Sequence, residues 1–96
     1  MKRSSDRPIG DAIREFLNTY NLEDKLNETR LIHSWEKVVG PMIAKYTRKM
    51  YIRNKILYVK VESAALRTEL SFSRSRILRA LNEEVKATVI EDIVLN

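Results

Sequence analysis

Residues Leu31–Thr47, which read LIHSWEKVVGPMIAKYT, hold the single tryptophan of the 96-residue chain and decide how the rest of it folds. Their large apolar side chains recur at spacings of three and four, so they share one stripe of an α-helix. These side chains are Leu31, Trp35, Val38, Val39, Met42, Ile43 and Tyr46. A tryptophan can be an exposed recognition residue, but its place on the stripe favours burial. We predict that the stripe faces the core and that Trp35 packs against the strands that follow.

The dipeptide Gly40-Pro41 interrupts this helical pattern. Pro41 lacks the N–H that would bond to the carbonyl of Lys37, and its ring crowds that carbonyl, so the helix is expected to bend or restart here. We expect Gly40 to let the hairpin backbone approach closely and Pro41 to begin the next turn. Because the stripe continues to Tyr46, both halves are predicted to face the same core.

After Thr47 the apolar pattern changes from a helical period to a period of two, which is typical of β-strands. One face of the predicted strands carries Met50, Ile52, Leu57, Val59 and Val61. The opposite face carries Lys49, Tyr51, Arg53, Ile56, Tyr58 and Lys60. Asn54-Lys55 separates the two runs, so we predict a β-hairpin that buries the first face and exposes the second.

Helical patterns precede the central stretch. A first helix is predicted from Pro8 to Tyr20, because apolar residues recur there at helical spacing. They are Ile9, Ile13, Phe16, Leu17 and Tyr20. A second helical piece follows a cap at Asn21, with Glu23 and Asp24 in its first turn. The spacing leaves open whether this piece joins Leu31–Tyr46 as one helix.

A third helix and a third strand are predicted after the hairpin. Ser63 is well placed as the N-cap of the helix. Its core stripe is Leu66, Leu70, Ile77, Leu78, Leu81 and Val85. Thr88–Leu95 is rich in Val and Ile and predicts the strand. The order of elements predicts an α+β fold with helices on one face of a three-stranded, mainly antiparallel sheet. Residues 1–7 are expected to form a disordered basic arm and residues 8–96 a single domain.

The composition argues against an enzyme. The chain has no cysteine, and its one histidine, His33, is expected to face solvent opposite the apolar stripe. The acidic residues are scattered except for Glu83-Glu84, whose side chains point about 100° apart on a helix. We therefore expect no cofactor, no metal and no small-molecule substrate. No apolar run approaches the ~18 residues of a membrane span, so no membrane partner and a cytoplasmic location are predicted.

Basic residues are concentrated in the second half of the chain. Between Lys45 and Arg79 there are ten basic residues and two acidic ones, a net charge of +8, whereas the remainder nets −3. Such a block favours binding of nucleic acid, single-stranded or double-stranded, although a solvated basic face is the alternative. Tyrosines among these charges could stack with bases. The candidate nucleic-acid residues are Lys45, Arg48, Lys49, Tyr51, Arg53, Lys55, Tyr58, Lys60 and Arg74.

Phe72 is a second candidate for recognition. It lies about 160° from the core stripe of the third helix, and Arg76 and Arg79 follow it at four and seven residues. This exposed aromatic and cationic strip suits a protein partner or nucleic acid about equally. We assign Phe72, Arg76 and Arg79 as candidate partner-binding residues.

The central stretch and the elements after it resemble the DciA family of bacterial helicase loaders. The resemblance rests on Trp35-x-x-Val38-Val39-Gly40-x-x-Ile43-Ala44, then the hairpin with Leu57-x-Val59-x-Val61, and Glu69-Leu70 within the third helix. It implies a KH-like domain with the element order α-α-β-β-α-β, and a non-enzymatic protein that loads or operates the replicative DNA helicase. That helicase is the partner that the resemblance implies. The alternative is a KH-like RNA-binding module in translation or RNA turnover, although the chain lacks a G-x-x-G loop.

Overall fold

The computed structural model describes residues 9–19 and 22–96, and for residues 16–19 it describes the backbone only. The arm predicted for residues 1–7, and the cap predicted at Asn21, lie outside the described residues. The helices are α1 (Ile9–Thr19), α2 (Leu22–His33), α3 (Trp35–Val39), α4 (Pro41–Tyr46), α5 (Ala64–Phe72) and α6 (Arg74–Val85). The strands are β1 (Thr47–Arg53), β2 (Ile56–Val61) and β3 (Asp92–Leu95). None of the described helices is long and apolar enough to cross a bilayer.

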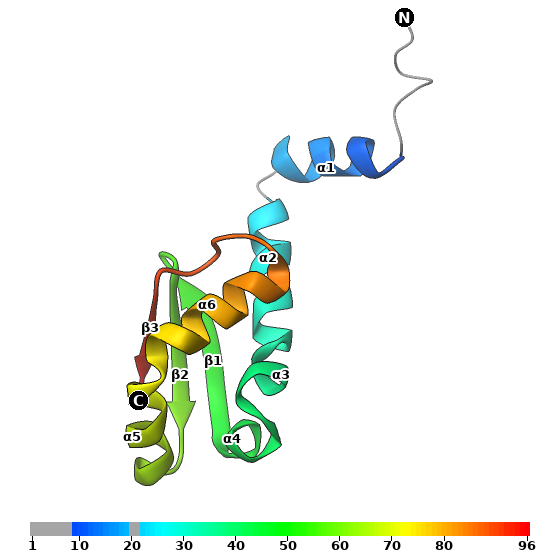
Figure 1. Cartoon of the computed structure of the whole chain (residues 1–96). Coiled ribbons are helices and arrows are strands. Elements are labelled where there is room, and N and C mark those ends of the chain that lie inside the picture. Colours follow the sequence, from blue (N-terminus) through cyan, green and yellow to red (C-terminus); the bar gives the residue numbers. More distant parts are fainter. Residues whose placement is uncertain (1–8, 20–21) are drawn as a thin grey trace, which may run out of the picture.

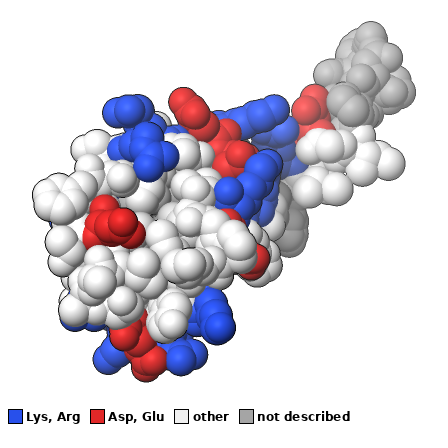
Figure 2. Space-filling view, turned by 60° about the horizontal axis from the view of Figure 1, so that its bottom comes forward, with Lys and Arg blue, Asp and Glu red and all other residues white. Residues whose placement is uncertain are grey.

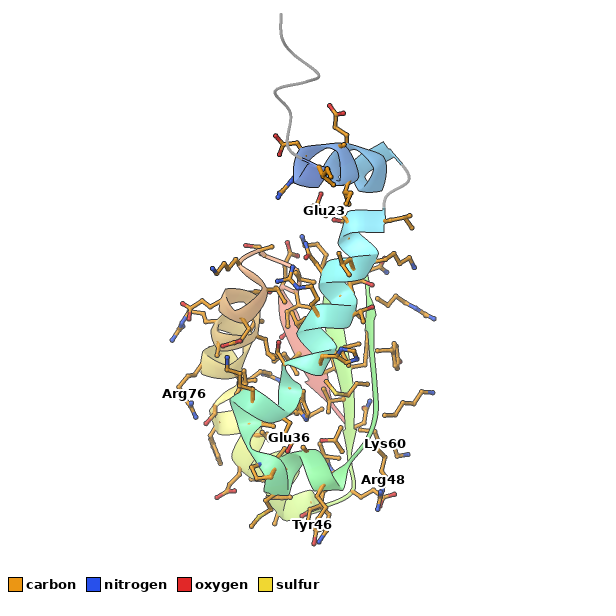
Figure 3. All side chains as sticks on the ribbon, turned by 90° about the vertical axis from the view of Figure 1, so that its right-hand side faces the viewer. Glu23, Glu36, Tyr46, Arg48, Lys60 and Arg76 are labelled. Carbon is orange, nitrogen blue, oxygen red and sulfur yellow. The ribbon has the colours of Figure 1, made fainter. Side chains whose placement is uncertain are left out.

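The described elements form two layers, with the helices α2 to α6 on one face of a sheet of order β1-β2-β3 (Figures 1 and 3). The antiparallel β1–β2 pair aligns six residue pairs and the parallel β2–β3 pair aligns four, so the sheet is mainly antiparallel. The predicted α+β class with helices on one face is therefore confirmed, whereas the KH-like label stays a prediction. Helix α1 lies beyond the N-terminal end of α2, away from the sheet (Figure 1).

The hairpin forms as its alternating sequence predicts. Asn54 and Lys55 both have positive φ, 52° and 63°, which is the conformation of a two-residue turn that matches the twist of the flanking strands. Leu57, Val59 and Val61 of β2 are buried against the helices, each worth roughly 1.5–3 kcal/mol of transfer free energy. Their alternation fixes the register, because a slip of one residue would expose all three.

Strand β3 is shorter than predicted and begins at Asp92 instead of Thr88. The preceding loop is held on α6 by the Asn82 side chain, whose Oδ1 accepts from the N–H groups of Val89 and Ile90, at 2.9 and 3.1 Å, and whose Nδ2 donates to the carbonyl of Ile90 at 2.9 Å. Asp92 aligns with Ile56, the first residue of β2, so the residues before Asp92 lie beyond the end of that strand in the parallel register. The chain joins the sheet only after this loop and then runs parallel to β2.

Gly40-Pro41 divides the central stretch into α3 and α4, as predicted, with Pro41 in the first turn of α4. The role expected for Gly40 is wrong: a Cβ there would meet no atom within 4 Å, and the glycine is needed because its φ is +95°. The helical phase also changes at this break. Met42 and Tyr46 are consequently 65% and 40% exposed, contrary to the prediction that they face the core.

The burial of Trp35 is confirmed, since only 3% of the residue is exposed. Its indole Nε1 donates to the Thr47 hydroxyl at 2.9 Å, and that hydroxyl donates to the carbonyl of Ile43 at 2.8 Å. The buried core around it consists of Leu31, Leu57, Val59, Val61, Leu70, Ile77, Leu81, Val85, Ile90 and Ile93.

The sequence left open whether the second helical piece joins the central stretch as one helix. Ser34 is a turn residue that separates α2 from α3, so the two are distinct helices.

The predicted third helix is two helices, α5 and α6, which meet at Ser73. Ser63 caps α5 as predicted, because its Oγ accepts from the Leu66 N–H at 3.2 Å. The predicted stripe nevertheless persists across the break. Leu70, Ile77, Leu81 and Val85 are buried, and Leu66 and Leu78 are half-buried against them.

Replacing Thr47 by Val keeps the shape of the side chain but removes the acceptor of the Trp35 indole. We expect a loss of ~1–3 kcal/mol in the free energy of unfolding, because a buried N–H is left without a partner. Urea unfolding followed by Trp35 fluorescence measures this. The matched control is Thr68→Val, which removes a similar hydroxyl bond, to the carbonyl of Ala64, at an exposed site and should cost less than ~0.5 kcal/mol. Equal losses in the two variants would contradict the role given to Thr47.

Candidate nucleic-acid and partner interfaces

The outer face of the sheet carries the predicted basic and aromatic residues of the hairpin. The cross-strand pairs there are Lys49 with Lys60, Tyr51 with Tyr58, and Arg53 with Ile56. A β-bulge between Thr47 and Lys49 adds one residue to β1. Thr47 therefore bonds to the buried Trp35, whereas Lys49, two residues later, points to the opposite face.

The two tyrosines form the centre of this face. The ring centroids of Tyr51 and Tyr58 are 4.8 Å apart and the rings are inclined by 13°, so the rings stack on each other. The Nζ of Lys49 lies 5.6 Å from the centroid of Tyr51, within the range of a cation–π contact. The face thus combines a stacked aromatic pair with flexible cations.

Lys49 and Lys60 are directly opposite each other, an arrangement that repels and lowers stability. Both are exposed, and among the described residues neither forms an ion pair. At the far end of the same face, Arg53 is exposed on β1 and Asp92 is exposed on β3. The positive charge therefore lies over β1 and β2 and not over the edge formed by β3.

Four predicted nucleic-acid residues lie outside this pairing. Arg48 sits at the bulge and pairs with Glu62, with 2.6 Å between Nε and Oε1. Lys55, in the hairpin turn, donates from Nζ to the carbonyl of Thr88 at 3.1 Å. Lys45 is exposed in the last turn of α4. Arg74 begins α6 beside Leu70 and Ile77, in the helical layer, so the structure does not bring it together with the outer face.

Phe72 lies at the rim of a groove of about 400 Å³ between α3–α4 and α5–α6. It is 84% exposed, as the helical arithmetic predicted. The groove is lined by Val38, Val39, Ile43, Glu69, Leu70, Phe72, Ser73, Arg76 and Ile77. Arg76 therefore joins Phe72 in the groove, whereas Arg79 is exposed one turn further along α6 and does not line it. Sequence reasoning missed Val38, Val39 and Ile43 as groove residues because it assigned them to the core stripe.

The groove and the outer sheet face lie on opposite sides of the molecule. In Figure 3 the side chain of Lys60 points away from the helices, and the side chain of Arg76 points in the opposite direction. Figure 2, which looks toward the end where α4 and α5 lie, shows basic and some acidic side chains at its upper and lower margins, and between them a largely uncharged surface that carries an acidic cluster. The two candidate surfaces are thus separate.

A model of the family described as "Dna[CI] antecedent, DciA" matches residues 8–95, almost the whole chain. The chain belongs to the DciA family. This family is associated with loading of the replicative helicase, and it is not a known enzyme family. A UPF0232 protein of Corynebacterium glutamicum (strain R) is 33% identical over 60 residues, which are 62% of this chain and 34% of that protein. The chain thus spans about a third of the length of the curated relative that it matches.

His33 and the Glu83-Glu84 pair are the side chains of this DciA-family chain that were considered for chemistry from the sequence. His33 is exposed at the end of α2. Glu84 of the Glu83-Glu84 pair forms an ion pair with Lys37, with 2.9 Å between oxygen and nitrogen. Within residues 9–19 and 22–96, no group of three such side chains could hold a metal ion.

The opposed lysines of this DciA-family domain yield a test of stability. Lys60→Gln removes the repulsion with Lys49 and should raise the free energy of unfolding by about 0.2–1 kcal/mol at low salt. The gain should shrink near ~1 M salt, where the screening length is only about 3 Å. Thermal melts at both salt concentrations measure it. Lys45→Gln, an exposed lysine with no cross-strand partner, is the control and should change little; destabilisation by Lys60→Gln at low salt would argue against repulsion.

Proposed function

We propose that this protein is a non-enzymatic accessory protein that loads or operates the replicative DNA helicase in the bacterial cytoplasm, and that it binds both the helicase and nucleic acid. The observation that supports the proposal is that a domain of this family carries a basic, aromatic sheet face and, on the opposite side, an apolar groove with an exposed phenylalanine. These two surfaces are the outer face of the sheet and the groove beside Phe72.

The outer face is proposed to bind nucleic acid. Lys49, Lys60 and Arg53 are exposed there, and the first two face each other at a cost in stability. A bound polyanion would relieve that repulsion and release counterions, which is the usual source of affinity for nucleic acid. The binding is expected to be largely independent of sequence, because long flexible cations contact phosphates and not base edges.

The groove is proposed to bind the helicase. Protein interfaces are commonly centred on aromatic and arginine residues that fit into apolar surroundings. Phe72 and Arg76 provide these residue types, and the half-buried side chains of Val38, Val39 and Ile43 provide apolar surface next to them. An exposed phenylalanine that belongs to a contiguous apolar patch indicates an interaction site, whereas a single exposed apolar side chain does not.

The alternative of an RNA-binding module in translation or RNA turnover is not favoured by membership of the DciA family. Affinity purification from the source cells separates the two possibilities. Recovery of a hexameric helicase is the expected result. Recovery of ribosomes or RNA without the helicase would contradict the proposal.

Nucleic-acid binding should depend strongly on salt. If about four phosphates are neutralised, the logarithm of affinity should fall with the logarithm of salt concentration with a slope near −3 to −4. Fluorescence anisotropy with single-stranded and double-stranded DNA over a range of salt concentrations measures this slope. An affinity that stays constant between low and moderate salt would mean that the basic block only solvates the surface.

Phe72→Ala should weaken binding of the helicase without unfolding the domain. Because the site is exposed, the change in stability should be below ~0.5 kcal/mol, whereas the loss in binding free energy should be ~1–2 kcal/mol if Phe72 is a central contact. Titration of the purified cognate helicase, beside a thermal melt, measures both quantities.

The control for this experiment is the double charge reversal Arg53→Glu and Lys60→Glu on the other side of the molecule. It should weaken nucleic acid more than helicase, because it alters only the outer sheet face. If Phe72→Ala folds normally and binds the helicase as well as the parent does, the helicase contacts a different surface.

A further inference from the structure

The stacked tyrosines bear on the kind of nucleic-acid contact that the outer face can make. A base that stacks on a protein aromatic ring needs one open face of that ring. Tyr51 and Tyr58 cover one face of each other, because their centroids are 4.8 Å apart and their planes are nearly parallel. One face of each ring is therefore already occupied.

The surroundings of the pair limit stacking further. The Nζ of Lys49 lies 5.6 Å from the centroid of Tyr51 and is attracted to that ring. On the other side, Tyr58 is half-buried next to β3, where Val94 is its partner in the parallel register. A base that stacked on Tyr51 would therefore compete with Lys49 for this ring.

The charges around the pair favour a different ligand atom. Lys49 and Lys60 form a cross-strand pair at one end of the tyrosines, and Arg53 lies at the other end, four residues along β1. Four residues of strand span roughly 13 Å, so these cations can contact several phosphates of one backbone. Asp92, on the β3 side, repels phosphates and directs the backbone over β1 and β2.

We infer that the outer face binds the sugar-phosphate backbone through Lys49, Lys60 and Arg53, and that the Tyr51–Tyr58 stack supports these cations without receiving bases. The ligand class is therefore a phosphodiester backbone, whether single-stranded or duplex. Tyrosine hydroxyls can add hydrogen bonds to phosphate oxygens. This inference rests on the proposed nucleic-acid function and specifies the part of the ligand that the face contacts.

The test compares ligands that have the same phosphates but different bases. Anisotropy titrations use a single-stranded oligonucleotide of about 12 nucleotides, within the usual range of site sizes, an abasic oligonucleotide of the same length, and the corresponding duplex. The normal and abasic strands are expected to bind within about twofold of each other, because both release counterions in the same way. An abasic strand that binds about tenfold or more weakly would show base stacking and overturn the inference.

Two protein variants test the same inference by changing the outer face instead of the nucleic acid. Tyr51→Leu removes the stacked ring and should change the affinities for the normal and the abasic strand by the same factor, within about twofold, because no base contact is lost. The double variant Lys49→Gln and Lys60→Gln should reduce the magnitude of the salt slope on single strands by about 1.4, roughly 0.7 for each phosphate contact.

The outcomes separate the inference from the function on which it rests. A strong loss of affinity in Tyr51→Leu for the normal strand but not the abasic strand would overturn the inference while leaving nucleic-acid binding intact. If the parent protein binds none of the three ligands at low salt, nucleic-acid binding on this face fails and the inference fails with it. A thermal melt of each variant confirms that it is folded.

Discussion

The hydrogen bonds that run from the Trp35 indole through the Thr47 hydroxyl to the Ile43 carbonyl join α3, the last turns of α4 and the start of β1 at one point. Because a buried indole N–H needs an acceptor, Thr47 stabilises Trp35 in the core. Thr47 in turn bonds to the helix that precedes it. This contact therefore fixes where the helical layer ends and where the sheet begins.

The position of Thr47 also determines which side chains reach solvent. Thr47 pairs with the buried Val61, and strand residues two apart would ordinarily share its face. The bulge that follows inserts Arg48, so Lys49 is directed to the outer face instead. Without the bulge the strand would have to expose its apolar side chains. Thr47 and the inserted Arg48 thus determine both the contact with Trp35 in the core and the position of Lys49 on the basic outer face.

The elements that depend on local pattern could be predicted from the sequence, and those that depend on contacts between distant residues could not. The hairpin, the break at Gly40-Pro41 and the exposure of Phe72 follow from periodicity and backbone chemistry. The start of β3 depends on its register with Ile56, the first residue of β2, and the loop before it is held by Asn82, a polar residue in α6 that gives no periodic signal. The groove beside Phe72 was missed because a stripe shows that residues are apolar, but not whether the packed layer covers them completely.

The arrangement of the two surfaces has an electrostatic consequence for the proposed function. A layer of helices about 10–12 Å in diameter lies between the outer sheet face and the groove side, and the screening length at physiological salt is about 8 Å. Phosphates bound near Lys60 would therefore interact only weakly with Arg76 on the opposite side. Helicase and nucleic acid need not compete for the same cations. A domain that holds both at once raises the concentration of one near the other without any change in its own conformation.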